Sequence, residues 1–449
     1  MTTAVGGSCK TPRGMGVPPM EHGQDARATP ASKEFCKSLV DVIVLGGGTA
    51  GMIAAIQAGR AGAKTLLVEK NAMLGGTMTV QGVNYPAHFF AWGRQIVAGI
   101  GWELLCKTYA ETGCPLPTPQ QGSRHIPVDP VILAALADQA ALDAGVELLF
   151  HAMPADIAWK KEAWNVRICT KTGLRTVRAR VVIDATGDAN AAALAGFGVV
   201  RPDVVQPATL SFRCSGYDAD ALDYDALKAA ADQATAAGEL LATDIGWWRD
   251  GPKALLRKRG SNANHLRAPD AHTSEGKSRA EIEGRKALLR MVRFLRKQPG
   301  LERFQIDWAC PEAGIRETVT IRGKTTVSVA DYESGRRYDD ALCYAFYPID
   351  EHLNDGRGIH GRPLKEGVLP TIPRGAMLPA GGRFFIVAGR ALSSDREANS
   401  ALRVECPCMA MGQAAGAMAA LSARSGTDPE ALPLEDVRAL LRAHGAIVP

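Results

Sequence analysis

The 449-residue sequence lacks several features that would place it in a specialised class. No run of about 18 apolar residues without charge occurs, so no membrane span is expected. The ten cysteines include no C-x2-C pair, which argues against zinc ribbons and ferredoxin-type clusters, and no metal site is predicted. The net charge of +5 comes without a basic block, so nucleic acid is not an expected partner. A composition of 46% hydrophobic and 22% charged residues is typical of a globular protein.

The cysteines and the N-terminal segment bear on location. Cysteines without a spacing pattern are typical of reduced, mostly buried thiols, which predicts a cytoplasmic protein. The first 33 residues lack the apolar middle of a signal peptide. Because the segment is rich in Gly, Pro, Thr and charge and shows no periodicity, we expect a disordered tail over residues 1–38.

A strand–helix–strand unit is predicted directly after this tail. LVDVIVL (39–45) is a short apolar run that ends in glycines, as buried parallel strands do. Residues 50–62 carry small and apolar side chains at helical spacing, and AKTLLVE (63–69) is a second buried strand. Together they form a βαβ unit of the usual length.

The glycine turn of this unit predicts a dinucleotide site. Gly46 allows the tight turn, Gly48 lets the backbone approach a pyrophosphate, and Gly51 lets helix and strand pack closely. The helix N-terminus offers unpaired N–H groups and a positive dipole to the phosphates. Glu69 follows the second strand, can accept both ribose hydroxyls and would repel a 2′-phosphate, which argues against NADP.

Further segments favour FAD over NAD. KNAMLGGTMT (70–79) places a glycine pair and two hydroxyls just after the acid, while VVIDATGDAN (181–190) and FFIVAGRALSS (384–394) each end a strand in glycine. Strand ends face the ligand crevice in parallel sheets, and a helix from about Met409 can aim its N-terminus at a flavin carbonyl. The predicted cofactor-binding residues are Gly46, Gly48, Thr49, Ala50, Gly51, Glu69, Lys70, Gly75, Gly76, Thr77, Thr186, Gly187, Asp188, Gly389, Arg390 and Gly412.

The chain as a whole predicts an α/β fold: an FAD-binding Rossmann-type parallel sheet with helices on both faces, plus an inserted α+β domain. The pattern changes between residues 206 and 373, so we expect a discontinuous FAD-binding domain at 39–205 and 374–449 and a substrate or cap domain at 206–373. A hairpin is expected around Thr172-Gly173. Helices are expected at 130–145, 224–240, 279–297, 408–423 and 434–444.

These motifs also carry a family resemblance. DVIVLGGGTAGMIAAIQAGRAGAKTLLVEK, LGGTMT, VVIDATGDAN, GIRET and VAGRALSSDREANSALRVECPCMAMGQAAGAMAA resemble the FAD-dependent oxidoreductase family with the glutathione-reductase-type Rossmann fold, including its heterodisulfide reductase-like group. The resemblance runs from about residue 39 to 445. It implies non-covalent FAD, with the pyrophosphate over Gly46–Gly51, the adenosine ribose on Glu69, and the flavin near Gly75–Thr79 and residues 389–412.

Two departures from the family limit what the resemblance implies. The iron–sulfur cysteine runs of the heterodisulfide reductase-like group are missing, so cluster-mediated electron transfer is not carried over. Arg396 stands where many relatives have a His after the Gly-Arg motif, so a role for that His does not transfer.

Three residues are candidates for the chemistry. His88, in NYPAHFFAWGRQ, could be a general base because imidazole titrates near neutral pH; a core or surface histidine is the alternative. Arg316 in AGIRET and Arg403 in ALRVE could clamp a carboxylate or stabilise an oxyanion or the reduced flavin. The alternative for both arginines is an ion pair with a neighbouring Glu.

A pair of cysteines and a pair of tryptophans are also candidates for a role in the site. Cys406 and Cys408 precede the flavin-facing helix, but a disulfide across one residue would be strained, so we expect packing cysteines. Trp247 and Trp248 either line a substrate cleft or fill the second domain.

The leading functional hypothesis is an FAD-dependent oxidoreductase that transfers a hydride between a small organic substrate and flavin N5. No second G-x-G-x-x-G lies between a strand and a helix, so electrons should come from the substrate itself or from an external carrier. The alternative is a flavin-containing electron-transfer protein that docks on a partner protein, and a third interpretation is an NAD-binding module without redox turnover. The sequence does not identify the electron acceptor and is compatible with a homo-oligomer.

Overall fold

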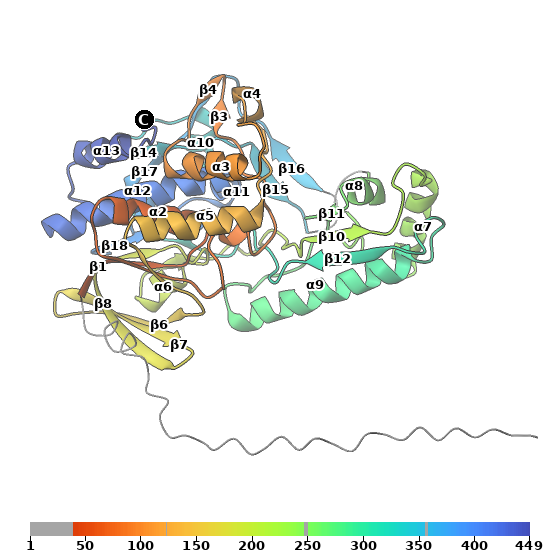
Figure 1. Cartoon of the computed structure of the whole chain (residues 1–449), viewed down its shortest axis with the longest axis horizontal. Helices are drawn as coiled ribbons and strands as arrows, with labels where there is room; N and C mark the ends of the chain where they lie inside the picture. The colour runs from red at the N-terminus through yellow and green to blue at the C-terminus, as the bar shows by residue number, and fades with distance from the viewer. Residues whose placement is uncertain (1–38, 123, 247–249, 355–357) are drawn as a thin grey trace, which may run out of the picture.

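The computed structural model describes residues 39–449 except 123, 247–249 and 355–357. The predicted tail at 1–38 and the Trp247-Trp248 pair therefore lie outside the described residues. Figure 1 shows a larger lobe built from both ends of the chain and a smaller lobe, at the right, built from its middle.

A seven-stranded sheet lies at the centre of the larger lobe. Its parallel part runs in the order β5 (Glu147–Leu149), β2 (Thr65–Val68), β1 (Leu39–Leu45) and β8 (Gly173–Asp184), and β18 (Phe385–Val387) also pairs in parallel with β8. β7 (Ala163–Thr170) and β6 (Met153–Lys160) continue the sheet in antiparallel fashion from the first half of β8. The predicted strands of the βαβ unit and the hairpin at Thr172-Gly173 are confirmed.

Both faces of β1 are buried, which explains why its sequence is apolar almost throughout. Val42 and Val44 belong to one hydrophobic cluster, together with residues of several helices. Ile43 and Leu45 belong to the cluster on the other face, with residues of β6, β7 and the short helix α6 (Asn190–Leu194). Four of the helices that contribute to the cluster of Val42 and Val44 are α2 (Thr49–Arg60), α3 (Ile100–Glu111), α5 (Pro130–Asp143) and α12 (Glu405–Ser425).

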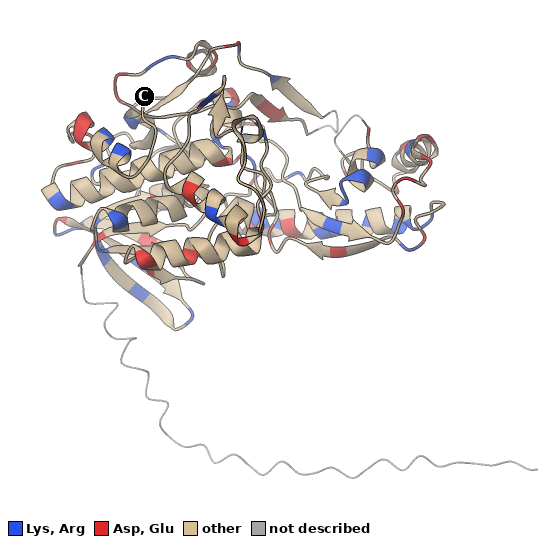
Figure 2. Ribbon diagram, turned by 45° about the horizontal axis from the view of Figure 1, so that its top comes forward, with Lys and Arg blue, Asp and Glu red and all other residues tan. Residues whose placement is uncertain are grey.

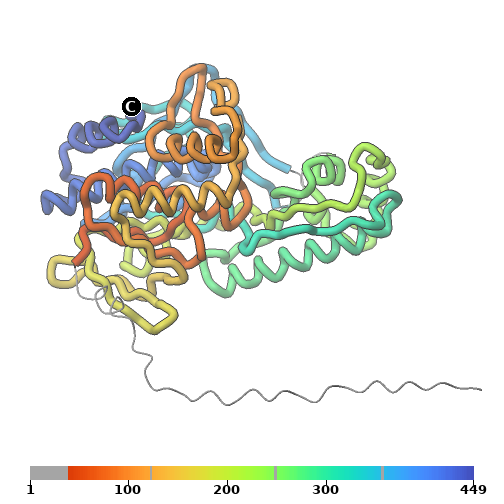
Figure 3. Tube along the Cα trace, in the orientation of Figure 1, coloured from red at the N-terminus to blue at the C-terminus, as the bar shows by residue number. Residues whose placement is uncertain are grey.

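Helix α12 packs directly on α2, which joins the two ends of the chain. A Cβ atom on Gly412 would lie 2.2 Å from the Ala50 carbonyl oxygen, and one on Gly416 would lie 2.3 Å from that of Ala54. These glycines permit the backbones to approach closely. Figure 3 shows the red segment that follows residue 39 and the blue C-terminal segment lying together in the larger lobe. The predicted helix at 408–423 is present and begins slightly earlier, at Glu405.

The smaller lobe has a hydrophobic cluster of its own, formed by residues between Ala208 and Ile315. A three-stranded antiparallel sheet, in the order β11, β10, β12, lies beside the long helix α9 (Figure 1). Its elements are β10 (Phe212–Ser215), α7 (Tyr224–Ala236), α8 (Pro252–Arg257), β11 (Gly260–Ser261), α9 (Ser274–Leu295) and β12 (Gln305–Ala309).

Residues 327–378 pack differently from the rest of the predicted inserted domain. Tyr332, Leu342, Ile349 and Ile372 belong to the same hydrophobic cluster as α2 and α12. The apolar packing thus changes between about residues 315 and 327, within the segment 206–373. The domain bounds themselves stay a prediction. The elements here are α10 (Val329–Ser334), β14 (Ala341–Tyr344), β15 (Ile349–His352), β16 (Ile359–Arg362) and β17 (Thr371–Pro373).

The other elements are short connections or cover the core. They are β3 (Phe90–Ala91), β4 (Arg94–Gln95), α4 (Pro119–Gly122), β9 (Val199–Val200), β13 (Thr320–Ile321), α11 (Arg396–Leu402) and α13 (Leu434–Ala443). Basic and acidic residues are interspersed over both lobes (Figure 2). In the described part of the chain, no helix combines the length and the apolar character needed to cross a bilayer.

Candidate functional site

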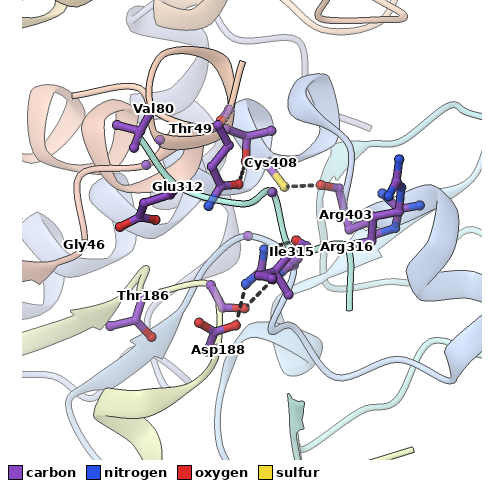
Figure 4. Close-up of a pocket in the computed structure, with 18 of the residues that line it drawn as sticks. Gly46, Thr49, Val80, Thr186, Asp188, Glu312, Ile315, Arg316, Arg403 and Cys408 are labelled. Carbon is purple, nitrogen blue, oxygen red and sulfur yellow. Dashed lines mark hydrogen bonds and ion pairs between the residues drawn. The ribbon is translucent and has the colours of Figure 1, made fainter. Parts of the chain in front are cut away.

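One cavity of about 1250 Å³ lies at the carboxyl ends of the parallel strands. Its wall includes Gly46 after β1, Thr186 after β8 and Gly389 after β18. The three strand ends expected to converge therefore do so in one crevice. Figure 4 shows the residues at its centre.

The first glycine turn is built so that one of its glycines faces open space. Gly46 has φ +101°, and a Cβ there would lie 2.4 Å from the Ala185 carbonyl oxygen. A Cβ on Gly51 would lie 1.8 Å from the Gly46 oxygen, so both glycines are required by the protein itself. At Gly48 the nearest atom to an added Cβ is the Gly76 Cα, at 4.0 Å. No side chain caps α2 at this point, so its N-terminal N–H groups are available to a phosphate that approaches Gly48.

Glu69 supports the turn and lines the cavity. It is buried, and its carboxylate accepts hydrogen bonds from the backbone N–H of Gly47 (2.6 Å) and of Asn71 (2.8 Å). A carboxylate has about four lone-pair sites, so two more donors can be accommodated. The position and chemistry of Glu69 fit the two hydroxyls of a ribose.

Arg390 ties the second and third strand ends together. Its Nε donates to the Gly187 carbonyl oxygen at 2.7 Å, and its two Nη groups contact the Asp188 carboxylate and the Ile315 carbonyl oxygen. The preceding residue, Gly389, lies beside α2, since an added Cβ would be 3.3 Å from the Ala50 Cβ. The segment at 389–390 therefore adjoins the first glycine turn.

Most of the predicted cofactor residues line this cavity, and three do not. Those in the wall are Gly46, Gly48, Thr49, Ala50, Glu69, Lys70, Gly76, Thr77, Thr186, Gly187, Asp188, Gly389 and Arg390. Gly51 and Gly75 are not among the described lining residues but hold the turn, since the Gly75 N–H donates to the Gly47 oxygen at 2.9 Å. Gly412 is also not among the described lining residues. Its missing side chain permits the contact between α12 and α2, and its expected cofactor contact stays a prediction.

Arg316 and Arg403 lie together on the side of the pocket opposite Gly46 (Figure 4). One Nη of Arg316 donates to the Pro207 oxygen (2.8 Å) and to Thr209 Oγ1 (2.9 Å). Burial and the nearby charge of Arg403 lower the pKa of Arg316 to about 9.

The sequence left open that each arginine forms an ion pair with a neighbouring Glu. Among the described contacts, neither Arg316 nor Arg403 forms such a pair. Glu317 pairs with Arg396 at 3.3 Å rather than with Arg316. Arg403 instead contacts Gln206 Oε1 (3.1 Å) and the Asp350 carboxylate (3.4 Å).

A buried histidine pair beside the arginines had no sequence signal. His265 Nε2 and His352 Nδ1 are 2.9 Å apart, and His352 Nε2 lies 3.3 Å from an Asp350 oxygen. Burial, together with the charge of Arg316, lowers the pKa of His352 to about 3 and that of His265 further. Both rings are therefore neutral at pH 7, and the distances favour His352 as the donor to Asp350. These residues come from segments without a motif, so only the fold reveals the pair.

Glu405 is a second residue that the sequence did not single out. It is the first residue of α12 and lines the cavity beside Arg403 and Cys408. Burial raises the pKa of its carboxyl group to about 7. A group with such a pKa can accept or release a proton near neutral pH.

The cysteines that follow are poor nucleophiles. Burial raises the pKa of both Cys406 and Cys408 well above the usual range. The Cys408 thiol donates to the Arg403 carbonyl oxygen at 3.2 Å, and both residues are free thiols. This agrees with the expectation of packing cysteines, because the thiolate form is disfavoured.

His88 is not among the described residues that line the cavity, and its expected role as a general base stays a prediction. Its ring lies behind His125 and Tyr347, with ring centroids 6.0 and 5.4 Å away. Those two residues do line the cavity, and burial lowers the pKa of His125. The aromatic-rich local sequence indicated the surroundings of His88 but not the direction of its side chain.

Metal binding has no candidate in the described part of the chain, where no three His, Cys, Asp or Glu side chains come together to hold an ion.

Comparison with known proteins identifies the family. Residues 41–441 match the family of FAD dependent oxidoreductases. The thiamine thiazole synthase of Methanococcus vannielii is 28% identical over 157 residues, which cover 33% of this chain and 56% of the relative, so the chain spans about half the length of that protein.

Solved structures that resemble this protein have low sequence identity to it. A geranylgeranyl bacteriochlorophyll reductase-like protein from Thermoplasma acidophilum is 13% identical, covering 90% of this chain and 84% of that one, with a TM-score of 0.40. The anhydrotetracycline hydroxylase OxyS from Streptomyces rimosus is 14% identical, with coverages of 90% and 69% and a TM-score of 0.42. Because the family match covers nearly all of the described chain, this protein belongs to the FAD dependent oxidoreductases and is a flavoenzyme that uses FAD.

Proposed function

We propose that this protein transfers a hydride between a small organic substrate and the N5 atom of its flavin. The observation that carries the proposal is that a single cavity joins the first glycine turn to the polar end around Arg316, Arg403 and Glu405. Cavities of about 300–1000 Å³ suffice for a drug-sized ligand. At about 1250 Å³, this cavity fits a second molecule beside part of the cofactor.

The glycine-turn end of the cavity has the groups that a dinucleotide needs. The N-terminal N–H groups of α2 would hold the pyrophosphate, and Glu69 would accept the adenosine ribose hydroxyls. Bound FAD supplies the hydride acceptor or donor, while the protein provides binding, orientation and charge.

Glu405 is the residue best suited to handle the proton. Oxidation of an alcohol or amine removes a hydride from carbon and a proton from oxygen or nitrogen. With a pKa of about 7, a Glu405 carboxylate oxygen can take that proton, and in the reducing direction the protonated carboxyl can return it. His352 and His265 are less suitable, because burial lowers both pKa values and makes the rings weak bases, and Asp350 contacts one nitrogen of the pair.

The experiment is anaerobic flavin reduction. The purified holoenzyme would be mixed with a panel of alcohols, amines and hydroxy acids while flavin absorbance is recorded, and the reduced enzyme would be mixed with carbonyl compounds and enoates. We expect bleaching by one donor class, with a primary isotope effect when the transferred hydrogen is deuterium. Bleaching that occurs only with a co-purified protein, and with no small donor, would instead support an electron-transfer protein that docks on a partner.

A further inference from the structure

We infer that the substrate of this site carries a carboxylate group, and that Arg316 and Arg403 bind it together. The inference deepens the proposed function and rests on it, since it assigns the arginine end of the cavity to the substrate. Two observations support it: the unpaired N–H donors of the two arginines and the charged groups around them.

Arg316 has more donors than the protein uses. A guanidinium group carries five N–H donors in one plane. Only one Nη of Arg316 is paired within the described residues, with Pro207 and Thr209. Its other N–H groups have no carboxylate partner among the described ion pairs, since the neighbouring Glu317 pairs with Arg396. The residue is 9% exposed, and its exposed part faces the cavity. The remaining N–H groups are therefore placed for a ligand.

Arg403 also has an N–H donor without a partner in the protein. Its Nη2 contacts Gln206 and Asp350, but its Nε is buried and has no hydrogen-bond partner among the described residues. Buried donors of this kind are rarely left unpaired in a native protein. Because Arg403 lines the cavity, this unpaired donor belongs to a guanidinium group in the cavity wall.

The two arginines share one close carboxylate. The groups that act on them are Asp350, His352, His265, Glu317 and Glu405, with Lys258, His125 and Tyr347 further along the wall. Burial opposes ionisation of Asp350, but the His352 hydrogen bond and the two arginines lower its pKa to about 2, so it offsets one positive charge. The histidines are neutral and Glu317 pairs with Arg396 at 3.3 Å, so Arg316 has no carboxylate partner among the described ion pairs.

A bound carboxylate would supply an acceptor for the unpaired N–H donors and a partner for the charge of Arg316. A buried charge without a counter-ion is unfavourable, and the planar fork of a guanidinium matches the two oxygens of a carboxylate. The cofactor phosphates belong at the other end, on the Gly46 turn, whereas Arg316 is anchored to Pro207 and Thr209 (Figure 4). The substrate is therefore the ligand that would bring the negative charge.

The experiment measures ligand binding to the oxidised holoenzyme by calorimetry, so that turnover is not needed. The probes are propionate and benzoate, and their uncharged counterparts are propionamide and benzamide. We expect each carboxylate to bind at least about tenfold more tightly than its amide. Arg316→Gln and Arg403→Gln should each weaken carboxylate binding about ten- to hundredfold, as expected for charge-assisted hydrogen bonds, and leave amide binding unchanged.

Arg362→Gln is the matched control, because Arg362 pairs with Glu333 and Glu397 and is not a described lining residue. It should leave both affinities unchanged. Arg316→Gln also removes the hydrogen bonds to Pro207 and Thr209, so its melting temperature is recorded beside the binding data to show that the variant is folded. If either variant fails to fold, the other provides the test.

Two results would overturn the inference. One is equal affinity for the carboxylates and the amides. The other is a variant whose flavin reduction potential shifts while its carboxylate affinity stays the same, which would assign the arginines to the reduced flavin. Carboxylate binding that depends on the arginines, together with no flavin bleaching by any donor, would leave the anion site standing and contradict the hydride-transfer proposal alone.

Discussion

Glu405 combines two opposing influences on one carboxyl group. It begins helix α12, where the helix dipole favours negative charge, yet burial raises its pKa to about 7. Its place in the cavity wall, beside Arg403, fits the proton transfer that we propose for it. Nothing in the local sequence RVECPC distinguishes these two roles, because both depend on what surrounds the side chain.

Replacement of Glu405 should alter the pH dependence of catalysis. As the base for substrate oxidation, Glu405 must be ionised, so the rate of flavin reduction should rise with pH through about 7. In Glu405→Gln the rate should fall about 10²- to 10⁴-fold and lose this rise. Stopped-flow reduction across pH checks it, with Glu397→Gln as a control, since Glu397 pairs with Arg362 and is not a described lining residue. A wild-type profile retained by Glu405→Gln would contradict the assignment.

His352 should make the fold sensitive to acid. Burial lowers its folded-state pKa to about 3, whereas an unfolded imidazole titrates near 6.5. The unfolded chain therefore binds more protons between these values, so the stabilisation is fully present above about pH 6.5 and is lost as pH falls toward 3. The free energy of unfolding by urea should decrease between about pH 7 and pH 5.

The variant His352→Gln isolates this contribution. Its unfolding free energy should depend less on pH in the same window, although His265 retains part of the effect because burial lowers its pKa too. His360→Gln, in the exposed part of β16, should keep the wild-type slope. An unchanged slope in His352→Gln would mean that other groups control acid unfolding.

At the scale of elements, the glycines of the first turn serve two purposes: some permit the packing of the protein, and one permits a ligand to approach the backbone. Gly51 supports the packing of α2 on β1, because a Cβ there would lie 1.8 Å from the Gly46 oxygen. Gly48 has φ −68° and meets only the Gly76 Cα, at 4.0 Å. Its glycine is therefore explained by a ligand that approaches the backbone.

Alanine substitutions should separate these two requirements. Gly51→Ala should destabilise the protein by about 3 kcal/mol or more, since the methyl group would overlap backbone. Gly48→Ala should keep the apoprotein melting temperature within about 2 °C, because surface-like substitutions are usually near neutral, yet weaken FAD binding at least about tenfold. Differential scanning fluorimetry and FAD titration of apoprotein check both, and a Gly48→Ala protein that binds FAD normally would contradict the pyrophosphate site.

Elements were predicted where local pattern is strong. The buried strands β1 and β18 follow directly from apolar runs that lead into glycine, and β2 follows from an apolar run that ends at Glu69. Helix α9 begins at Ser274, five residues before the predicted start at 279, because the Thr273 side chain caps it by accepting the Gly276 N–H. A threonine cap in a polar stretch is easily missed when the hydrophobic pattern alone sets the boundary.

At the scale of the whole molecule, the cavity is shared by both lobes. Lys70, after β2, contacts Glu312, which follows β12 of the smaller lobe, and both line the cavity. Arg390 similarly reaches the Ile315 oxygen. A cofactor in this crevice would thus add contacts between segments that are distant in sequence.

Removal of FAD should therefore destabilise the whole molecule. A ligand present at 100 times its dissociation constant stabilises the folded state by about 2.7 kcal/mol, and the melting temperature of apoprotein should rise by several degrees when FAD is added. FMN should restore less, because it lacks the adenosine half that the Gly46 turn and Glu69 would hold. Calorimetric scans of apoprotein with each nucleotide check this, and equal recovery with FMN would contradict the assignment of that turn.

The sequence by itself determined the cofactor and the parallel sheet, because the glycine turn, the acid after β2 and the apolar strands are short-range patterns set by backbone geometry. Only the tertiary structure revealed the arginine end of the cavity. Arg316, Asp350 and Arg403 come from separate segments that meet in one wall. It also decided that Gly412 contacts a helix and that His88 stands behind the cavity wall. The direction and burial of a side chain depend on long-range packing, which a local pattern does not contain.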